Sequence, residues 1–149
     1  MHAGEYCNRD VVIAERKTGI QEAARLMRHH HVGDLVVVER IDDLVRPVGI
    51  VTDRDLVIEV LAEDVEPAAL TVEDVMSARL EAANEYDDVI ETLRRMRTLG
   101  IRRIPVVDQH GGLAGILAVD DLLGMVSGTL HDIVMLISRE VRVEEKNRP

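Results

Sequence analysis

The sequence predicts an α+β fold: two copies of a strand–helix–strand–strand–helix unit, followed by a C-terminal helix. An internal repeat is the first reason, because GIVTDRDLV at 49–57 resembles GILAVDDLL at 115–123, and VGDLVVVE at 32–39 resembles IRRIPVVD at 101–108. The second reason is that short β-rich runs alternate with segments of helical periodicity in each copy. A copy of roughly 60 residues buries only a marginal core alone, so the two copies are expected to pack together.

The first copy is expected to begin with a short apolar strand at 11–14. A helix should follow, since Thr18 and Gln21 have the spacing of a capping box, and Gly33 is expected to end it. Two β-rich runs and a second helical stretch complete the unit. These elements are expected as strands at 35–38 and 47–51, joined by a charged loop at 40–46, and a helix at 53–62.

The second copy is expected to repeat this order after an acidic link with a proline at 63–67. The motif TVEDVM at 71–76 predicts a short capped helix that leads into it. Its elements are expected as a strand near 80–82, a helix at 87–99, strands at 104–107 and 113–117, and a helix at 119–126. The repeat offset falls from 69 residues (32 to 101) to 66 (49 to 115), so the loop at 40–46 is three residues longer than its counterpart at 109–112.

Beyond the repeat, apolar residues at helical spacing predict one more helix, which is expected to cover an apolar face or to meet a partner chain. These residues are Leu130, Ile133, Val134, Ile137 and Val141. The charged tail at 144–149 is expected to fray. We therefore assign residues 1–65 to the first repeat, 66–128 to the second, and 129–149 to the C-terminal helix and tail.

The composition argues against several classes of function. A net charge of −10, with no Trp, no Phe and two Tyr, argues against nucleic acid as a partner, because its phosphates are bound by clustered positive charge and its bases by aromatic side chains. Cys7 is the only cysteine, so neither an intrachain disulfide nor a cysteine metal cluster is expected. With no signal peptide and no apolar run near about 18 residues, a cytoplasmic protein without a membrane span is predicted.

Three motifs make the chain resemble a tandem pair of CBS (cystathionine β-synthase) domains over residues 5–127. They are the strand RRIPVVD, the lead-in TVEDVMS and, above all, GIVTDRD at 49–55, which fits the family signature Gly–hydrophobic–x–Thr/Ser–x–x–Asp/Asn. The resemblance implies two copies packed through their sheets about a pseudo-two-fold axis, with two clefts between them. Such clefts often bind AMP, ADP, ATP, S-adenosylmethionine or NAD. Members usually regulate something else, and this chain, with little room for an attached enzyme or channel, resembles the stand-alone members.

Thr52 and Asp55 of that motif are the first candidate site residues. Thr52 lies where a strand is expected to end and a helix to begin, and a helix N-terminus offers free N–H groups and partial positive charge to a phosphate. The carboxylate of Asp55 can hold both ribose hydroxyls. Gly49 would let backbone approach closely. Thr52 and Asp55 also have nearly the spacing of a capping box, which needs no ligand.

Basic residues of the second copy are expected to complete this site. Arg102 and Arg103 stand just before a strand of the second copy. In related modules, the basic residue at this point reaches phosphate in the cleft whose Thr and Asp come from the other copy. The resemblance therefore implies one complete site from Thr52, Asp55 and Arg103, with Arg102 as a second basic candidate. A solvated strand end is the alternative explanation of the two arginines.

The second cleft is expected to be degenerate or empty. Ala118 replaces the threonine there, while Asp121 matches the ribose-type carboxylate and Asp34 stands where the other cleft has Arg103. An extra carboxylate repels phosphate. The resemblance also places Thr18, at the start of the first helix, near the purine of a bound nucleotide.

Two further patterns are explained without a special site. His29, His30 and His31 are consecutive on a predicted helix, so they cannot all face one metal ion, and histidine suits the negative end of a helix. The carboxylates at 53/55 and 120/121 have no nucleophile or metal motif beside them, so catalysis is not expected.

The sequence therefore predicts a cytoplasmic regulatory module, not an enzyme, that binds AMP, ADP or ATP between its copies and requires no metal. It is expected to form a homodimer and to change its contacts with an unidentified regulated partner when the nucleotide binds. Two alternatives stay open. The ligand could be S-adenosylmethionine or NAD, or the chain could be a ligand-free homodimeric interaction module in which Thr52 and Asp55 only cap a helix.

Overall fold

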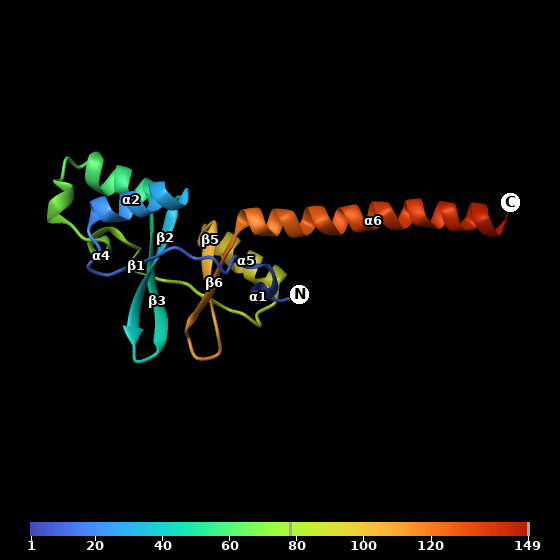
Figure 1. Cartoon of the computed structure of the whole chain (residues 1–149), viewed down its shortest axis with the longest axis horizontal. Coiled ribbons are helices and arrows are strands. Elements are labelled where there is room, and N and C mark those ends of the chain that lie inside the picture. The colour runs from blue at the N-terminus through green and yellow to red at the C-terminus, as the bar shows by residue number, and fades with distance from the viewer. Residues whose placement is uncertain (78, 149) are drawn as a thin grey trace.

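Each copy contributes one three-stranded sheet to the computed structural model, which describes residues 1–77 and 79–148 (Figure 1). The strands are β1 (Ile13–Glu15), β2 (Asp34–Ile41) and β3 (Leu44–Thr52) in the first copy, and β4 (Ala83–Asn84), β5 (Arg103–Val107) and β6 (Leu113–Ala118) in the second. The helices are α1 (Ala3–Tyr6), α2 (Ile20–His30), α3 (Asp53–Leu56), the π-helical turn η1 (Val57–Leu61), the 3-10 turn η2 (Pro67–Ala69), α4 (Val72–Val75), α5 (Val89–Leu99) and α6 (Val119–Asn147).

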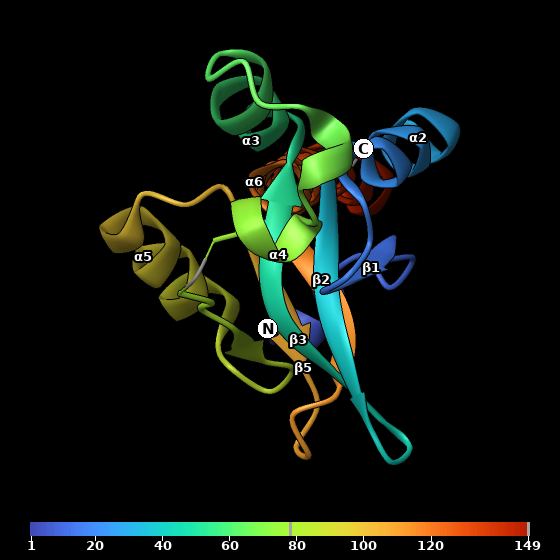
Figure 2. The ribbon, with the colours of Figure 1, turned by 90° about the vertical axis from the view of Figure 1, so that its left-hand side faces the viewer.

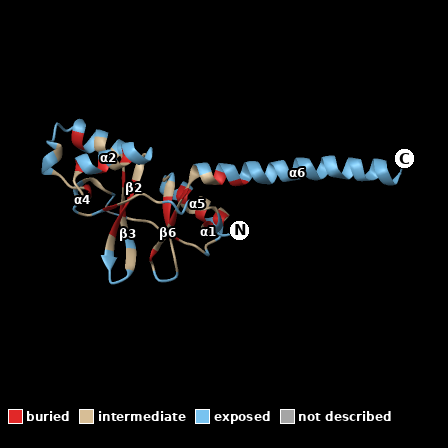
Figure 3. Cartoon of the chain, in the orientation of Figure 1, coloured by how far each residue is buried: buried red, intermediate tan, exposed pale blue. Residues whose placement is uncertain are grey.

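The two sheets have the same topology. In each, the first strand pairs parallel with the second, and the second pairs antiparallel with the third. Seen along α6, the helices α2 and α5 flank the strands on opposite sides (Figure 2). This arrangement confirms the predicted α+β fold with two β-α-β-β-α copies and a C-terminal helix, and buried residues follow the strands and the start of α6 (Figure 3).

The segment that leads into each copy packs against the other copy. Ala3 of α1 is fully buried in the core of the second copy, and Val72 of α4 is fully buried in the core of the first. Asn8 exchanges two backbone hydrogen bonds with Ile116 of β6, at 2.8 and 2.9 Å, and the Ser77 N–H donates to a carbonyl of β3 at 3.1 Å. Each core is therefore completed by the lead-in of the other copy. The domain boundaries after residues 65 and 128 stay a prediction from the repeat.

The start of α2 differs from the prediction. Gly19, not Thr18, is the N-cap, and no side chain caps this end. The Thr18 hydroxyl instead accepts a hydrogen bond from the Glu15 N–H at 3.0 Å and closes the turn between β1 and α2. Both leading strands, β1 and β4, also begin later than predicted, at residues 13 and 83. The prediction of a capping box was wrong here, because the Thr18 hydroxyl binds the Glu15 N–H in the turn and not an N–H of the helix.

The charged loop predicted at 40–46 is instead part of a long hairpin. The antiparallel ladder of β2 and β3 continues to the pair Ile41–Leu44, and Asp42 turns the chain with a φ of 53°. Antiparallel strands with one solvated side tolerate charged residues, so the charge pattern did not mark a loop.

A single helix, α6, replaces the two helices predicted at 119–126 and beyond. It runs from Val119 to Asn147 without a break, and the tail expected to fray is helical to Asn147. Gly124 and Gly128 lie inside it, with open space where a Cβ would be. A glycine lowers helix stability without forcing an end.

The end of α2 gives the first testable prediction. The helix ends at His31, which has a left-handed φ of 55°, and not through Gly33; the equivalent residue after α5 is Gly100, with a φ of 67°. His31→Gly is expected to raise the free energy of unfolding by about 0.5–1 kcal/mol, because a Cβ is unfavourable in this conformation. Urea denaturation measures this, with Gly100→Ala as the matched variant expected to lose stability. Unchanged stability of both variants would contradict it.

Candidate functional site

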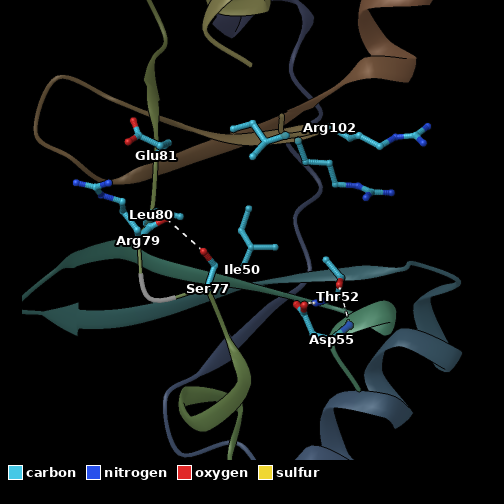
Figure 4. A pocket seen from close by; sticks show the side chains of 10 residues that line it. Ile50, Thr52, Asp55, Ser77, Arg79, Leu80, Glu81 and Arg102 are labelled. Carbon is cyan, nitrogen blue, oxygen red and sulfur yellow. Dashed lines mark hydrogen bonds between the residues drawn. The ribbon is translucent and has the colours of Figure 1, made fainter. Parts of the chain in front are cut away.

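A cleft of about 330 Å³ lies between the two copies (Figure 4). Its walls come from the junction of β3 with α3, from the residues before β5 and from the lead-in that follows α4. The lining residues are Ile50, Thr52, Asp55, Ser77, Arg79, Leu80, Glu81, Ile101, Arg102 and Arg103. Four of the six residues that the sequence proposes for the site are therefore in one cleft, which we call the first cleft.

Thr52 and Asp55 bind each other at the start of α3. The Asp55 N–H donates to Thr52 Oγ1 at 3.1 Å, and the Thr52 N–H donates to Asp55 Oδ2 at 2.8 Å. This pair is the capping box that needs no ligand. It uses one acceptor site of the hydroxyl and one carboxylate oxygen, so the Thr52 O–H and Asp55 Oδ1 keep the capacity to bind a further group.

Aliphatic side chains form the middle of the first cleft. Ile50 lies between the end that carries Thr52 and the segment from Arg79 to Glu81, which also contributes Leu80 (Figure 4). Among the lining residues that the structure describes there is no aromatic side chain. The cleft therefore offers an apolar middle for a flat ring, with polar and charged groups around it.

Arg103 makes an ion pair that crosses between the copies. Its Nε lies 3.0 Å from Oδ1 of Asp34, whose side chain is 16% exposed. Asp34 pairs with Thr52 in the ladder of β2 and β3, so the ion pair lies beside the start of α3. Burial raises the pKa of Asp34, Arg103 partly counters this rise, and the nearby carboxylate of Asp53 adds to it. An anion that recruits Arg103 must therefore compete with a partly buried carboxylate.

A second cleft, of about 260 Å³, is related to the first by the repeat. Ala118 and Asp121 take the places of the threonine and aspartate, and the Ala118 N–H donates to Asp121 Oδ2 at 2.8 Å. Four carboxylates line it, those of Asp10, Asp34, Asp120 and Asp121. The one arginine among its described lining residues is Arg103, which lines both clefts.

Three equivalent positions give the clefts opposite charge. The pairs, with the residue of the first cleft named before that of the second, are Arg79 and Asp10, Arg102 and Gly33, and Arg103 and Asp34. The first cleft thus carries three arginines and two carboxylates, against one arginine and four carboxylates in the second. Coulombic attraction for an anion is therefore concentrated in the first cleft.

One residue proposed from the sequence lies outside both clefts, and several residues that line the first cleft were not proposed. Thr18 is not among the described residues that line either cleft, because it lies in the turn after β1. Ser77, Arg79 and Glu81 line the first cleft and were missed. The repeat could have indicated Arg79, because it aligns this residue with Asp10. The sequence does not show, however, that each lead-in crosses onto the other copy.

Metal and membrane features can be stated for the described part of the chain. Within residues 1–77 and 79–148, no group of three or more His, Cys, Asp or Glu side chains is arranged to hold a metal ion. The sequence predicts no apolar segment long enough to cross a membrane, but α6 is long and apolar enough by length and composition alone. A single such helix is weak evidence for a span.

Comparisons with known proteins agree with this geometry. The model of the CBS domain family matches residues 3–62 and 72–128. An uncharacterised protein of Methanopyrus kandleri is 38% identical over 120 residues, which cover 80% of this chain but only 60% of that protein. The chain therefore spans less than two thirds of this relative's length.

Solved structures show the same fold. An uncharacterised conserved protein from Pyrococcus horikoshii has 30% identity and a TM-score of 0.73, with 84% of this chain and 91% of that chain covered. A CBS domain protein from Pyrobaculum aerophilum, complexed with AMP, has 25% identity and a TM-score of 0.72, with 82% of this chain and 90% of that chain covered.

Proposed function

This chain belongs to the CBS domain family as a tandem pair, and on that premise we propose that it is a cytoplasmic regulatory module that binds an adenine nucleotide in its first cleft. AMP, ADP and ATP are the proposed ligands, and no metal is required. The proposal holds whether the pair acts alone or within a longer chain. Regulation of another protein, and not catalysis, is its proposed role.

The charge difference between the two clefts carries this proposal. The first cleft has Arg79, Arg102 and Arg103 at positions where the second has Asp, Gly and Asp. An interface that binds no ligand does not require the basic residues to be gathered in one of the two clefts. An anionic ligand explains this difference, because the positive charge of the first cleft attracts it. We therefore propose one nucleotide site per chain, with Asp121 contributing to a weaker second cleft.

The residues of the first cleft suit the parts of a nucleotide. Arg102 and Arg103 would hold phosphate, since guanidinium groups bind phosphate oxygens in pairs. Asp55 Oδ1 would accept from the ribose, and the hydroxyl of Thr52 would add a phosphate contact. Ile50 would pack against the adenine ring. Thr18 stays proposed near the purine, as the resemblance implies, although it does not line the first cleft. The relative from Pyrobaculum aerophilum that binds AMP supports this class of ligand.

A nucleotide in this position could alter the contacts of the module. The first cleft has walls from both copies, so a ligand that binds one relative arrangement more tightly shifts the population towards it. The proposed readout is a changed contact with an unidentified regulated protein. A homodimer is part of the proposal, because large apolar side chains remain exposed on the second helix of each copy, as at Leu61 and Leu123.

A panel of thermal melts tests the ligand directly. AMP, ADP, ATP, S-adenosylmethionine and NADH would each be added to protein that has been checked to be free of bound nucleotide. A ligand present at a hundred times its dissociation constant should stabilise the chain by about 2.7 kcal/mol, which shifts the melting temperature by several degrees. A shift with S-adenosylmethionine or NADH alone would replace the proposed ligand class, and a flat panel would contradict nucleotide binding.

Asp55→Ala and Asp121→Ala form a matched pair of variants. Both carboxylates accept from the N-cap N–H of their helix at 2.8 Å, so both variants should lose a similar stability of about 0.5–2 kcal/mol. Only Asp55→Ala should also lose nucleotide affinity, because it removes the proposed ribose contact. Isothermal titration calorimetry with AMP measures this difference. Equal affinity of the two variants would contradict the assignment of the site to the first cleft.

The second candidate function is a ligand-free interaction module. The reciprocal hydrogen bonds between Thr52 and Asp55 favour it, since they explain both residues without a ligand. In that case the two alanine variants would lose stability alike, and no nucleotide would raise the melting temperature of the wild-type chain.

A further inference from the structure

The outer part of α6 contacts no other described element of the chain. Every residue from 126 to 148 is exposed, and in Figure 1 the helix projects away from both sheets. Most of the stability of helices in proteins comes from packing an apolar face, and not from helix propensity. The exposed length of α6 therefore lacks the packing that normally supports a helix.

Large apolar side chains form a continuous stripe along this helix. At 100° per residue they fall within an arc of about 80°, a narrow stripe like the seam of a coiled coil. The stripe consists of Leu123, Val126, Leu130, Ile133, Ile137 and Val141, and these side chains are 46–63% exposed. The two buried residues of α6, Leu122 and Met125, face the second copy, and the stripe runs along the helix beside this packed face.

Charged residues on α6 argue against a membrane as the occupant of the stripe. Crossing a bilayer core takes about 20 predominantly apolar residues, and charges near its centre are costly. Asp121, Asp132 and Arg139 interrupt α6, and the longest stretch between two of them is ten residues, from 122 to 131. These charges leave no uncharged stretch long enough to cross a bilayer.

The charge distribution favours a second copy of this chain. The chain has a net charge of −10, so two copies repel each other over most of their surface. Beyond residue 128 the charges balance, with four acidic and four basic residues, which are Asp132, Glu140, Glu144, Glu145, Arg139, Arg142, Lys146 and Arg148. The outer helix is therefore a part of the molecule where two copies can meet without net repulsion.

The area of the stripe is sufficient for a modest interface. Burial of the exposed parts of six such side chains removes roughly 300 Å² of apolar surface per copy. Since interfaces are about 60% apolar, the pair would bury roughly 1,000 Å² in total, at the lower limit of specific interfaces. We infer that α6 packs along α6 of a second copy through this stripe. The inference rests on the homodimer in the proposed function and not on nucleotide binding.

Ile137→Asp tests this inference, with Met135→Asp as its matched control. Ile137 lies in the stripe, whereas Met135 is about as exposed but points to the opposite side of the helix. Sedimentation velocity across a wide range of concentrations would follow the change from the 16.6 kDa chain to an assembly of at least twice that mass. Ile137→Asp is expected to raise the dissociation constant of the assembly at least about tenfold, and Met135→Asp to leave it unchanged.

Each other outcome overturns the inference. A wild-type chain that stays monomeric, an Ile137→Asp chain that assembles as well as wild type, or equal weakening by both variants would exclude the stripe as the interface. Binding of the wild-type chain to phosphatidylcholine or phosphatidylserine vesicles in place of self-association would assign the stripe to a membrane. Nucleotide titration of each variant separates this test from the proposed function, because the first cleft does not include α6.

Discussion

Arg103→Gln is expected to weaken binding of AMP or ATP by about 10–100-fold. A hydrogen bond to a charged group contributes about 1.5–3 kcal/mol, which corresponds to that range of affinity. The loss should be nearly the same for both nucleotides if Arg103 holds the α-phosphate. Isothermal titration calorimetry at one ionic strength measures it, and an unchanged affinity would remove Arg103 from the proposed site.

Asp34→Asn is expected to have the opposite effect and to tighten binding, because it removes the competitor that holds Arg103 at 3.0 Å. The gain should vanish in the double variant with Arg103→Gln. Asp120→Asn is the matched control, since it removes a carboxylate of the second cleft that forms no ion pair with Arg103 in the described structure. If Asp34→Asn weakens binding, Asp34 orients Arg103 for the ligand and does not compete with it.

The free energy of unfolding of Asp34→Asn shows whether its change in nucleotide affinity is accompanied by a change in stability. Burial raises the pKa of Asp34 above its value in the unfolded chain, so folding disfavours the ionised form. The contribution of Asp34 to the free energy of unfolding therefore falls as pH rises from its unfolded pKa to its folded pKa. Above the folded pKa this loss of stability remains constant. The asparagine variant should then be at least as stable as wild type at neutral pH, and urea denaturation at two pH values checks this.

The residues of the site that depend on local sequence could be predicted. Thr52 and Asp55 lie three residues apart at a strand–helix junction, and their arrangement follows from capping within one short segment. Arg102 and Arg103 could be placed near the start of β5, because the apolar run that follows predicts this strand, but their place in the cleft was implied only by the resemblance to CBS pairs. The repeat then indicated which residues of the two copies are equivalent.

Contacts between distant segments could not be predicted. The Arg103–Asp34 ion pair joins strand ends from different copies, 69 residues apart, and forms only because the sheets meet there. Arg79 enters the first cleft because its lead-in crosses onto the other copy. The end of α2 at His31 could not be predicted for a different reason. A residue other than glycine in the left-handed conformation has no clear sequence signal, and the nearby Gly33 was the more usual helix end.

Gly115→Ala is expected to lower the free energy of unfolding by about 1–3 kcal/mol, the cost of overpacking a rigid contact. A Cβ at Gly115 would lie 2.6 Å from Cys7 Sγ and 2.8 Å from the backbone oxygen of Asn8. That backbone is held by its hydrogen bonds to Ile116, so it cannot move away cheaply. Gly115 thus permits the lead-in of the first copy to cross the second, as Gly49 permits the lead-in of the second copy to cross the first.

Gly49→Ala should cost less than Gly115→Ala, and the two variants should differ in how they are rescued. A Cβ at Gly49 would lie 2.6 Å from Met76 Sδ, the flexible part of a side chain, and 3.3 Å from the Ser77 oxygen. Met76→Ala should therefore restore part of the stability of Gly49→Ala, whereas Cys7→Ala should not restore Gly115→Ala, because the Asn8 carbonyl remains in the way. Gly124→Ala, with open space inside α6, is the control and should gain about 0.5–1 kcal/mol. Urea denaturation ranks the variants, and full rescue of Gly115→Ala by Cys7→Ala would show that the lead-in is held by its side chain and not by its backbone.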